Sequence, residues 1–337
     1  MSSTTTRNWR SSARSILRWL PGIAITLVAF WLLARAINWH DFLISLSSVP
    51  LGTLVLAVVF YLAGLVIRAI AWQFLLQRKV TAPTAVVVLC EGYLFNNILP
   101  FRLGELARAF LMGRRTRLGV FHVLPTIVVE RSYDLVIAAG LVLATLPLAL
   151  KLEWARPVAT VLLVVILAAL FACFLAARNR EWVEARAEQL GGRWSPVRRW
   201  VLPQLHSILE GFSVLTKFEY FATSFGLLLL SWFLAILRDW VLIRAYIPNA
   251  PLWWAALGSG ASNILGAVPS VMASLGTYEL GAVGALTLVG MTKESILAYS
   301  LIAHVTHLII SSIVGVFGLT QEGETFSNLY AEIRRVK

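Results

Sequence analysis

Three charged residues interrupt an otherwise strongly apolar chain. The stretch NNILPFRLGELARA, residues 96–109, carries Arg102, Glu105 and Arg108 directly after two asparagines and a proline. Such residues are tolerated at membrane depth where the backbone is enclosed by protein or lines a cavity. Arginines beside a helix start can hold a phosphate through paired hydrogen bonds, because the backbone N–H groups there also favour an anion. The stretch therefore predicts an anion-binding site, with Asn97 as a further polar contact.

A second group of charges follows in ERSYD, residues 130–134. Glu130 and Asp134 are four residues apart and so share one face of a helix, with Arg131 between them in the sequence. Arg131 either joins the two arginines above in binding the anion or forms a structural ion pair with a nearby carboxylate. In both cases these carboxylates and Glu105 balance the arginine charges and shape or gate the cavity.

Further ionisable residues occur in the second half of the chain. Glu279 stands alone in an apolar stretch, so it needs a cavity or an arginine partner, and we expect it to share the charge-balancing role. Arg238 and Asp239 point in different directions on a helix, so each is expected to seek a separate partner. His304 and His307 are one turn apart, but without a third ligand they indicate polar packing or proton handling rather than a metal. We predict neither a metal nor a cofactor.

The composition places these residues in a membrane protein. Of 337 residues, 58% are hydrophobic and 14% charged, with a mean hydropathy of +0.77, whereas soluble domains hold about 45–50% apolar and about 25% charged residues. The net charge of +12 does not indicate nucleic acid. The basic residues lie in short segments beside apolar runs, where they set topology and meet anionic headgroups. Two cysteines in apolar stretches make no disulfide framework.

Apolar stretches that can cross a hydrocarbon core of about 30 Å predict about six full membrane spans. They cover residues 19–37, 51–76, 123–149, 157–177, 221–246 and 296–319. Two further apolar regions, 84–113 and 252–290, are broken by polar segments that contain glycine and proline, so neither half of each region can cross comfortably as a straight helix. We predict an all-α polytopic membrane protein in which both broken regions form re-entrant hairpins.

The distribution of Lys and Arg supports these hairpins. If 84–113 crossed the membrane once, the arginines within 114–117 would lie on the opposite side from Arg78 and Lys79. With a hairpin, most of the 29 basic residues face the cytoplasm, as the positive-inside rule requires. Both termini are then cytoplasmic. So is the polar segment 178–220, whose interleaved tryptophans and arginines suit the membrane surface.

The same topology divides a single transmembrane domain, residues 1–337, into two repeats. Residues 19–149 and residues 157–319 each contain two spans, a broken hairpin and a third span, and the later elements match at a nearly constant offset. Three crossings per half is an odd number, so the second repeat is inverted relative to the first. Inverted repeats with discontinuous helices are a transporter architecture, with the binding site near the midplane where the repeats meet.

Three motifs carry a family resemblance. NNILPFRLGELARAFLM, VVERSYDL and LGTYELGAVGAL resemble the lysylphosphatidylglycerol synthase transmembrane region, whose members are also described as flippase-like proteins. The third motif departs, because Met272, Ala273 and Ser274 replace the family's Pro-Gly-Gly, while its glutamate is kept as Glu279. The first two motifs match at Asn97, Pro100, Arg102, Gly104, Glu105, Arg108, Glu130, Arg131 and Asp134.

The resemblance implies that the protein moves a phospholipid between leaflets, an aminoacylated one in the two-domain members. The sequence shows no nucleotide-binding motif, nucleophile elbow, metal cluster or soluble synthase domain, so we expect a protein that moves a lipid rather than an enzyme that makes one. We predict a flippase of the bacterial inner membrane for a phospho- or polyprenyl-type lipid with an anionic headgroup, beside a separate lipid-modifying enzyme. Two alternatives stay open: a membrane-embedded transferase that acts on a lipid acceptor, and a non-transporting scaffold of a lipid-modifying complex.

Overall fold

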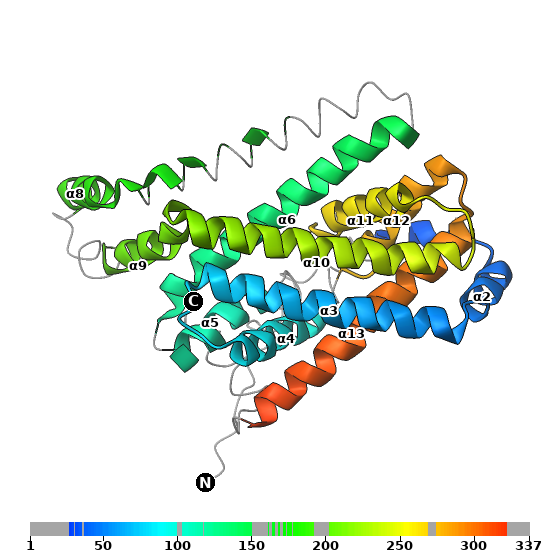
Figure 1. Ribbon diagram of the computed structural model, residues 1–337, viewed down its shortest axis with the longest axis horizontal. Helices are drawn as coiled ribbons and strands as arrows, with labels where there is room; N and C mark the ends of the chain where they lie inside the picture. Colours follow the sequence, from blue (N-terminus) through cyan, green and yellow to red (C-terminus); the bar gives the residue numbers. More distant parts are fainter. Residues whose placement is uncertain are drawn as a thin grey trace, which may run out of the picture.

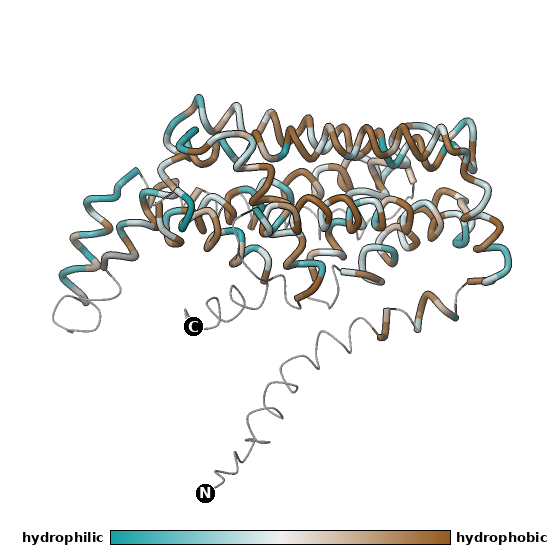
Figure 2. The backbone as a smooth tube through the Cα atoms, turned by 90° about the horizontal axis from the view of Figure 1, so that it is seen from below, coloured by the Kyte–Doolittle hydropathy of each residue, from teal (hydrophilic) through white to brown (hydrophobic). Residues whose placement is uncertain are grey.

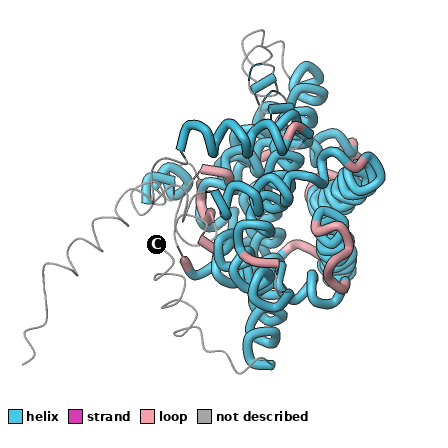
Figure 3. The backbone as a smooth tube through the Cα atoms, turned by 90° about the vertical axis from the view of Figure 1, so that its left-hand side faces the viewer, coloured by secondary structure: helices cyan, strands magenta, loops and turns pink. Residues whose placement is uncertain are grey.

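The described part of the chain is helical. The computed structural model describes residues 27–99, 103–149, 161–191, 202–268 and 274–321, with gaps at 30, 36, 117 and several positions between 162 and 177. These residues form helices and loops but no strand (Figure 3). The helices are α2 (Trp39–Ser47), α3 (Leu51–Leu75), α4 (Ala82–Ile98), α5 (Gly104–Thr116), α6 (Val120–Ala149), α8 (Arg180–Gly191), α9 (Leu202–Phe212), α10 (Phe218–Arg244), α11 (Leu252–Gly266), α12 (Thr277–Leu286) and α13 (Lys293–Gln321).

Within the described residues, four helices are long and apolar enough to cross a membrane, namely α3, α6, α10 and α13. They coincide with four of the six predicted spans; the other two, 19–37 and 157–177, lie largely outside the described residues. Figure 2 shows apolar residues along most of the length of the long helices. Large apolar side chains remain exposed on their outer faces, such as Val55, Leu229 and Ile313. A bundle with an apolar exterior is suited to a lipid environment.

Helices α3 and α10 lie side by side (Figure 1). Gly64 of α3 faces α10 at this contact, where a Cβ would lie 3.6 Å from the nearest atoms of Leu234 and Ser231. The Ser231 hydroxyl donates a hydrogen bond of 3.0 Å to the carbonyl oxygen of Gly64. Small residues of this kind are what helix pairs need where no water drives them together.

The two broken regions form two helical hairpins, α4–α5 and α11–α12. Each hairpin packs on a long helix from the other half of the chain: α4 on α13, and α11 on α6. Glycines permit both contacts. A Cβ at Gly315 would lie 2.7 Å from the carbonyl oxygen of Cys90, and a Cβ at Gly260 would lie 3.1 Å from that of Ala138. The halves are therefore interlocked through their hairpins.

The break in the first hairpin is closed by an asparagine. The side-chain oxygen of Asn96 accepts a hydrogen bond of 2.8 Å from the backbone N–H of Gly104, the first residue of α5, so it satisfies a donor that a helix start leaves open. A Cβ at Gly104 would lie 2.0 Å from the carbonyl oxygen of Gly92. Only glycine fits this crossing of α4 and α5.

The break in the second hairpin relies on left-handed backbone. Ser274 has φ +68° and Gly276 has φ +89°, a region that favours glycine. The Ser274 hydroxyl donates to the carbonyl oxygen of Gly266 at 2.9 Å, and the Glu279 carboxylate accepts from the backbone N–H of Gly276 at 2.7 Å. Ser274 occupies the position of the second glycine in the family's Pro-Gly-Gly. Its backbone therefore has a conformation that favours glycine. Met272 and Ala273 lie outside the described residues.

The polar segment between the halves lies at one end of the bundle. Helix α9 packs against α6, where a Cβ at Gly211 would lie 2.5 Å from the carbonyl oxygen of His122. Helix α8 lies beside α9 (Figure 1). Both chain termini, residues 1–26 and 322–337, fall outside the described residues, so their cytoplasmic side stays a prediction.

Candidate functional site

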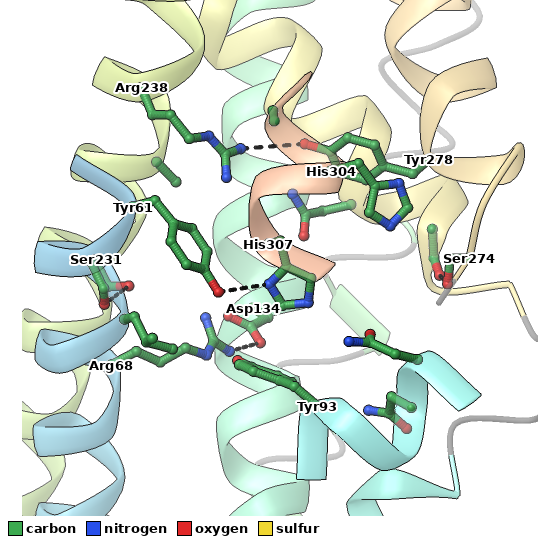
Figure 4. Close-up of a pocket in the computed structure, with 18 of the residues that line it drawn as sticks. Tyr61, Arg68, Tyr93, Asp134, Ser231, Arg238, Ser274, Tyr278, His304 and His307 are labelled. Carbon is green, nitrogen blue, oxygen red and sulfur yellow. Dashed lines mark hydrogen bonds and ion pairs between the residues drawn. The ribbon is translucent and has the colours of Figure 1, made fainter. Parts of the chain in front are cut away.

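A cavity of about 260 Å³ lies where the two hairpin breaks meet the long helices. The first hairpin contributes Asn96, Asn97 and Glu105, and the second contributes Asn263, Ser274 and Tyr278. The long helices contribute Tyr61 and Arg68 from α3, Arg131 and Asp134 from α6, Ser231 and Arg238 from α10, and His304 and His307 from α13 (Figure 4). Polar groups from both halves of the chain therefore converge on one space inside an apolar bundle.

Glu130 lies at the centre of what we term the first charge cluster, which comprises Arg68, Arg108, Arg131, Glu105, Glu130 and Asp134. Its carboxylate is fully buried. One oxygen lies 2.9 Å from the Arg68 guanidinium and 3.0 Å from that of Arg131, and the other lies 2.6 Å from Arg108. Three arginines from three helices share this one carboxylate, so a buried charge is compensated on every side.

The remaining carboxylates complete the first charge cluster. Asp134 pairs with Arg68, lies 3.3 Å from Arg131 and accepts a hydrogen bond of 2.9 Å from the indole N–H of Trp232. Glu105 meets Arg131 at 3.6 Å, the longest of these ion pairs. Three arginines and three carboxylates give the cluster no net charge, and none of the arginines loses its proton at physiological pH.

The arginines predicted to hold the anion are placed differently. Arg108 is 2% exposed, lies with its guanidinium carbon 3.5 Å from the centre of the Trp72 ring, and is not among the residues that line the cavity. Arg131 does line it, with 28% of its side chain exposed, against 14% for Arg68 and 10% for Arg238. Arg102 lies outside the described residues, so its headgroup contact stays a prediction, as does that of Arg108.

Asn97 also lines the cavity, at the end of α4. Its side-chain nitrogen donates to the hydroxyls of Ser311 and Ser312 on α13, at 3.2 Å and 3.0 Å. The side-chain oxygen is buried without a hydrogen-bond partner. Asn97 therefore ties the first hairpin to the last long helix and keeps one acceptor for a further ligand.

The second charge cluster comprises Arg238, Asp239, Glu279 and His304. Arg238 and Asp239 pair with each other at 2.7 Å, so the prediction of separate partners was wrong. The long arginine side chain reaches back to the adjacent carboxylate, which also accepts a hydrogen bond of 2.5 Å from Ser259. Arg238 in addition donates to the Tyr278 hydroxyl at 3.5 Å.

Glu279 has a histidine partner. One carboxylate oxygen lies 2.6 Å from Nδ1 of His304, and the side chain is 3% exposed. Glu279 does not line the cavity, whereas His304 does. The expectation of a cavity position or an arginine partner was therefore wrong, because α13 lies against α12 and brings a histidine to this carboxylate instead.

Tyr61 and His307 lie between the two charge clusters (Figure 4). The Tyr61 hydroxyl is 3.1 Å from Nδ1 of His307, and the Tyr93 ring centre is 4.9 Å from that of the histidine.

In the described residues no group of three His, Cys, Asp or Glu side chains could hold a metal.

Arg68 and Tyr61 line the cavity but were not assigned to the site from the sequence. Arg68 interrupts an apolar span, and such an arginine at membrane depth is a signal that could have assigned it to the site. Tyr61 carries no such signal, because a tyrosine in an apolar helix is also typical of ordinary packing. Its place beside His307, 246 residues later in the chain, follows from the tertiary structure.

A family model agrees with the motifs. The model described as "Lysylphosphatidylglycerol synthase TM region" matches residues 19–315. The chain belongs to this family. Comparison with curated proteins finds no match. The family match and the four apolar helices together make the chain a multi-pass integral membrane protein, and the resemblance inferred from the three motifs is confirmed.

Proposed function

We propose that this member of the family moves a phosphate-bearing lipid between the leaflets of the bacterial inner membrane, with the headgroup held in the central cavity. The observation that carries the proposal is the placement of Arg68, Arg131 and Arg238 around one cavity inside an apolar bundle. Its volume of about 260 Å³ is close to the lower end, about 300 Å³, of small-molecule sites. A headgroup can occupy such a space while its acyl chains stay in the lipid.

In this proposal the molecule is built from two inverted repeats. Helix α3 corresponds to α10, the hairpin α4–α5 to α11–α12, and α6 to α13. The helix contacts support this assignment. Helix α3 packs on its counterpart α10, and the contact of α4 with α13 has its counterpart in the contact of α11 with α6. The two hairpins would be re-entrant, with their breaks meeting at the site near the midplane, as in other transporters with inverted repeats.

Arg131 is the arginine best placed to hold the phosphate. It is the most exposed of the three that line the cavity, and its Nε is buried without a hydrogen-bond partner. Its pair with Glu105 is long, at 3.6 Å, so a phosphate can replace that carboxylate at modest cost. Glu105 would then act as a gate that swings away when the headgroup arrives. Glu130 and Asp134 hold the guanidinium in place. Arg108, which stacks on Trp72, would fix the position of Glu130 through their ion pair.

Leaflet exchange of a labelled phosphatidylglycerol in proteoliposomes tests the proposal. Arg131→Lys keeps the charge but loses the planar fork, and losing a charge-assisted hydrogen bond of about 1.5–3 kcal/mol lowers headgroup binding by roughly tenfold or more. We expect the exchange rate to fall accordingly while thermal unfolding stays near that of the wild type. Arg180→Lys on the exposed face of α8 is the matched control.

Three outcomes would contradict the proposal. The first is wild-type protein that leaves the labelled lipid in its original leaflet. The second is exchange by well-folded Arg131→Lys at the wild-type rate. Covalent modification of the lipid by the purified chain would instead identify a membrane-embedded transferase.

A further inference from the structure

The second charge cluster holds a group that the first does not, a histidine. Every pair in the first charge cluster joins a carboxylate to an arginine, and arginine stays protonated in proteins. In the second charge cluster, Glu279 joins His304. Histidine gains and loses a proton within the physiological pH range, so a single proton decides the charge of this pair.

The pair connects the cavity to the second hairpin. His304 lines the cavity, and its Nδ1 lies 2.6 Å from one oxygen of Glu279. The other oxygen of Glu279 accepts the backbone N–H of Gly276 at 2.7 Å. Ser274, two residues earlier, also lines the cavity. Protonation of His304 therefore acts on a carboxylate that anchors the hairpin break, which is itself part of the cavity wall.

The groups that surround His304 come from each helix packed against α13. Tyr278 of α12 places its ring centre 5.1 Å from that of His304, and its hydroxyl accepts from Arg238, which Asp239 already balances. On α13 itself His307 lies one turn away and meets Tyr61 of α3 and Tyr93 of α4. Helix α2 meets the far start of α13, where the Asn38 backbone donates to Glu294. Arg68 of α3 pairs with Glu130 and Asp134.

We propose that Glu279 and His304 form a proton-binding site whose occupancy is linked to binding of the anionic headgroup. This proposal rests on the proposed function. With Nδ1–H donated to the Glu279 carboxylate, the pair carries one negative charge. A proton taken up at Nε2 of His304 gives an imidazolium beside a carboxylate, with no net charge. The cavity wall then repels an anion less, so headgroup and proton favour each other's binding, as reciprocal linkage requires.

Proton uptake on lipid binding tests the linkage directly. Short-chain phosphatidylglycerol is added to the purified protein in weakly buffered detergent at pH about 7, within the range in which histidine side chains generally change charge, and a pH-sensitive dye follows the protons. We expect wild-type protein to take up protons as the lipid binds and His304→Asn to take up none. Asparagine keeps a donor at the Nδ1 position but does not titrate. Binding by wild type without proton uptake, or undiminished uptake by His304→Asn, would overturn the proposal.

Two further variants make the test specific. His206→Asn removes a histidine that lies 3.0 Å from Glu184 with 54% of its side chain exposed, so it is the matched control outside the cavity and should behave as wild type. Glu279→Gln removes the carboxylate that stabilises the imidazolium, so we expect proton uptake on lipid binding near neutral pH to decrease. If His304→Asn does not fold, Glu279→Gln provides the test of proton uptake.

The exchange assay separates failure of this inference from failure of the proposed function. We expect wild-type exchange to be faster by about tenfold at pH about 5.5 than at pH about 8.5, as one charge near the headgroup implies, and His304→Asn to lose this dependence. Exchange that is independent of pH would overturn the linkage and leave the proposed function standing. Absence of exchange at both pH values would overturn the proposed function, while the binding experiment still decides whether the proton is taken up.

Discussion

In the first half of the chain the carboxylates of the charge cluster meet arginines, whereas in the second half Glu279 meets a histidine. In the proposed repeat, two residues of the first cluster correspond to two residues of the second. Arg68 and Arg238 are 170 residues apart, and the same separation lies between Asp134 and His304. The same arrangement of helices can thus carry arginine–carboxylate pairs of fixed charge in one half. In the other half it can carry a pair whose charge depends on one proton. In the proposed function the first cluster holds an anion, and in the proposed linkage the second regulates that binding.

The two hairpins differ in the same way. Asn96, an uncharged amide, closes the first break, and the crossing at Gly104 leaves no space for a side chain. Glu279, a carboxylate shared with His304, closes the second break. An amide anchor does not respond to pH, but a carboxylate anchor responds to the charge of its partner. We therefore expect the first hairpin to be the more rigid one, and the second to respond to protonation of His304.

The largest expected effect concerns Glu130, the centre of the permanent cluster. Glu130→Gln leaves Arg68, Arg108 and Arg131 without their shared counter-charge, and loss of one partner from a buried ion pair costs about 3–5 kcal/mol. Denaturant unfolding in detergent should show this loss. Glu219→Gln, at an exposed position of α10, is the control and should stay within about 0.5 kcal/mol. Equal stability of the two variants would remove the central role that the comparison gives to Glu130.

A smaller effect is expected at the hairpin crossings. Gly104→Ala places a Cβ 2.0 Å from a backbone oxygen, and such overpacking typically costs about 1–3 kcal/mol. Gly266→Ala in the second hairpin meets its nearest atom, on Tyr278, at 3.7 Å, so it should be neutral or slightly stabilising. Thermal unfolding of both variants measures the contrast. A well-folded Gly104→Ala with an unchanged midpoint would show that the first hairpin is no more rigid than the second.

The smallest effect concerns α9, which packs on the first half at α6. Partial burial raises the pKa of the Glu210 carboxyl, but its hydrogen bond to Lys79 and its neighbour His122 outweigh this, so its pKa lies below the ordinary value. The pair stabilises the folded state above the unfolded pKa of about 4.3 and loses this contribution as the pH falls through the lower folded value. With 41% of the Glu210 side chain exposed, Glu210→Gln should cost less than about 1 kcal/mol at neutral pH.

Stability measured against pH checks this prediction. The difference between wild type and Glu210→Gln should shrink as the pH falls below about 4, whereas Glu219→Gln should show no comparable trend. A difference that grows in acid would mean that the carboxyl is stabilised in its protonated form, contrary to the charges around it.

Several features of the fold follow from the sequence by simple physical chemistry. Apolar length predicted the helices α3, α6, α10 and α13, and polar interruptions predicted the two broken regions. Of the residues predicted for the site, Arg131, Asn97, Glu105 and Asp134 line the cavity, whereas Arg108 faces Glu130 and Trp72. Helical periodicity places residues on a face, but which face meets the cavity depends on the helices that pack around it.

The amino-acid sequence by itself determined that this is a helical membrane protein with breaks within residues 96–104 and 263–281, because the cost of exposing charges and backbone to lipid depends on local composition. Tertiary structure decided which charges meet. Arg68 pairs with Asp134 across 66 residues of chain, and Glu279 meets His304 rather than an arginine. Ion pairs and hydrogen bonds form within about 3–4 Å, and no rule of local sequence brings residues on different helices to that distance. Packing of the hairpins against the opposite half does so.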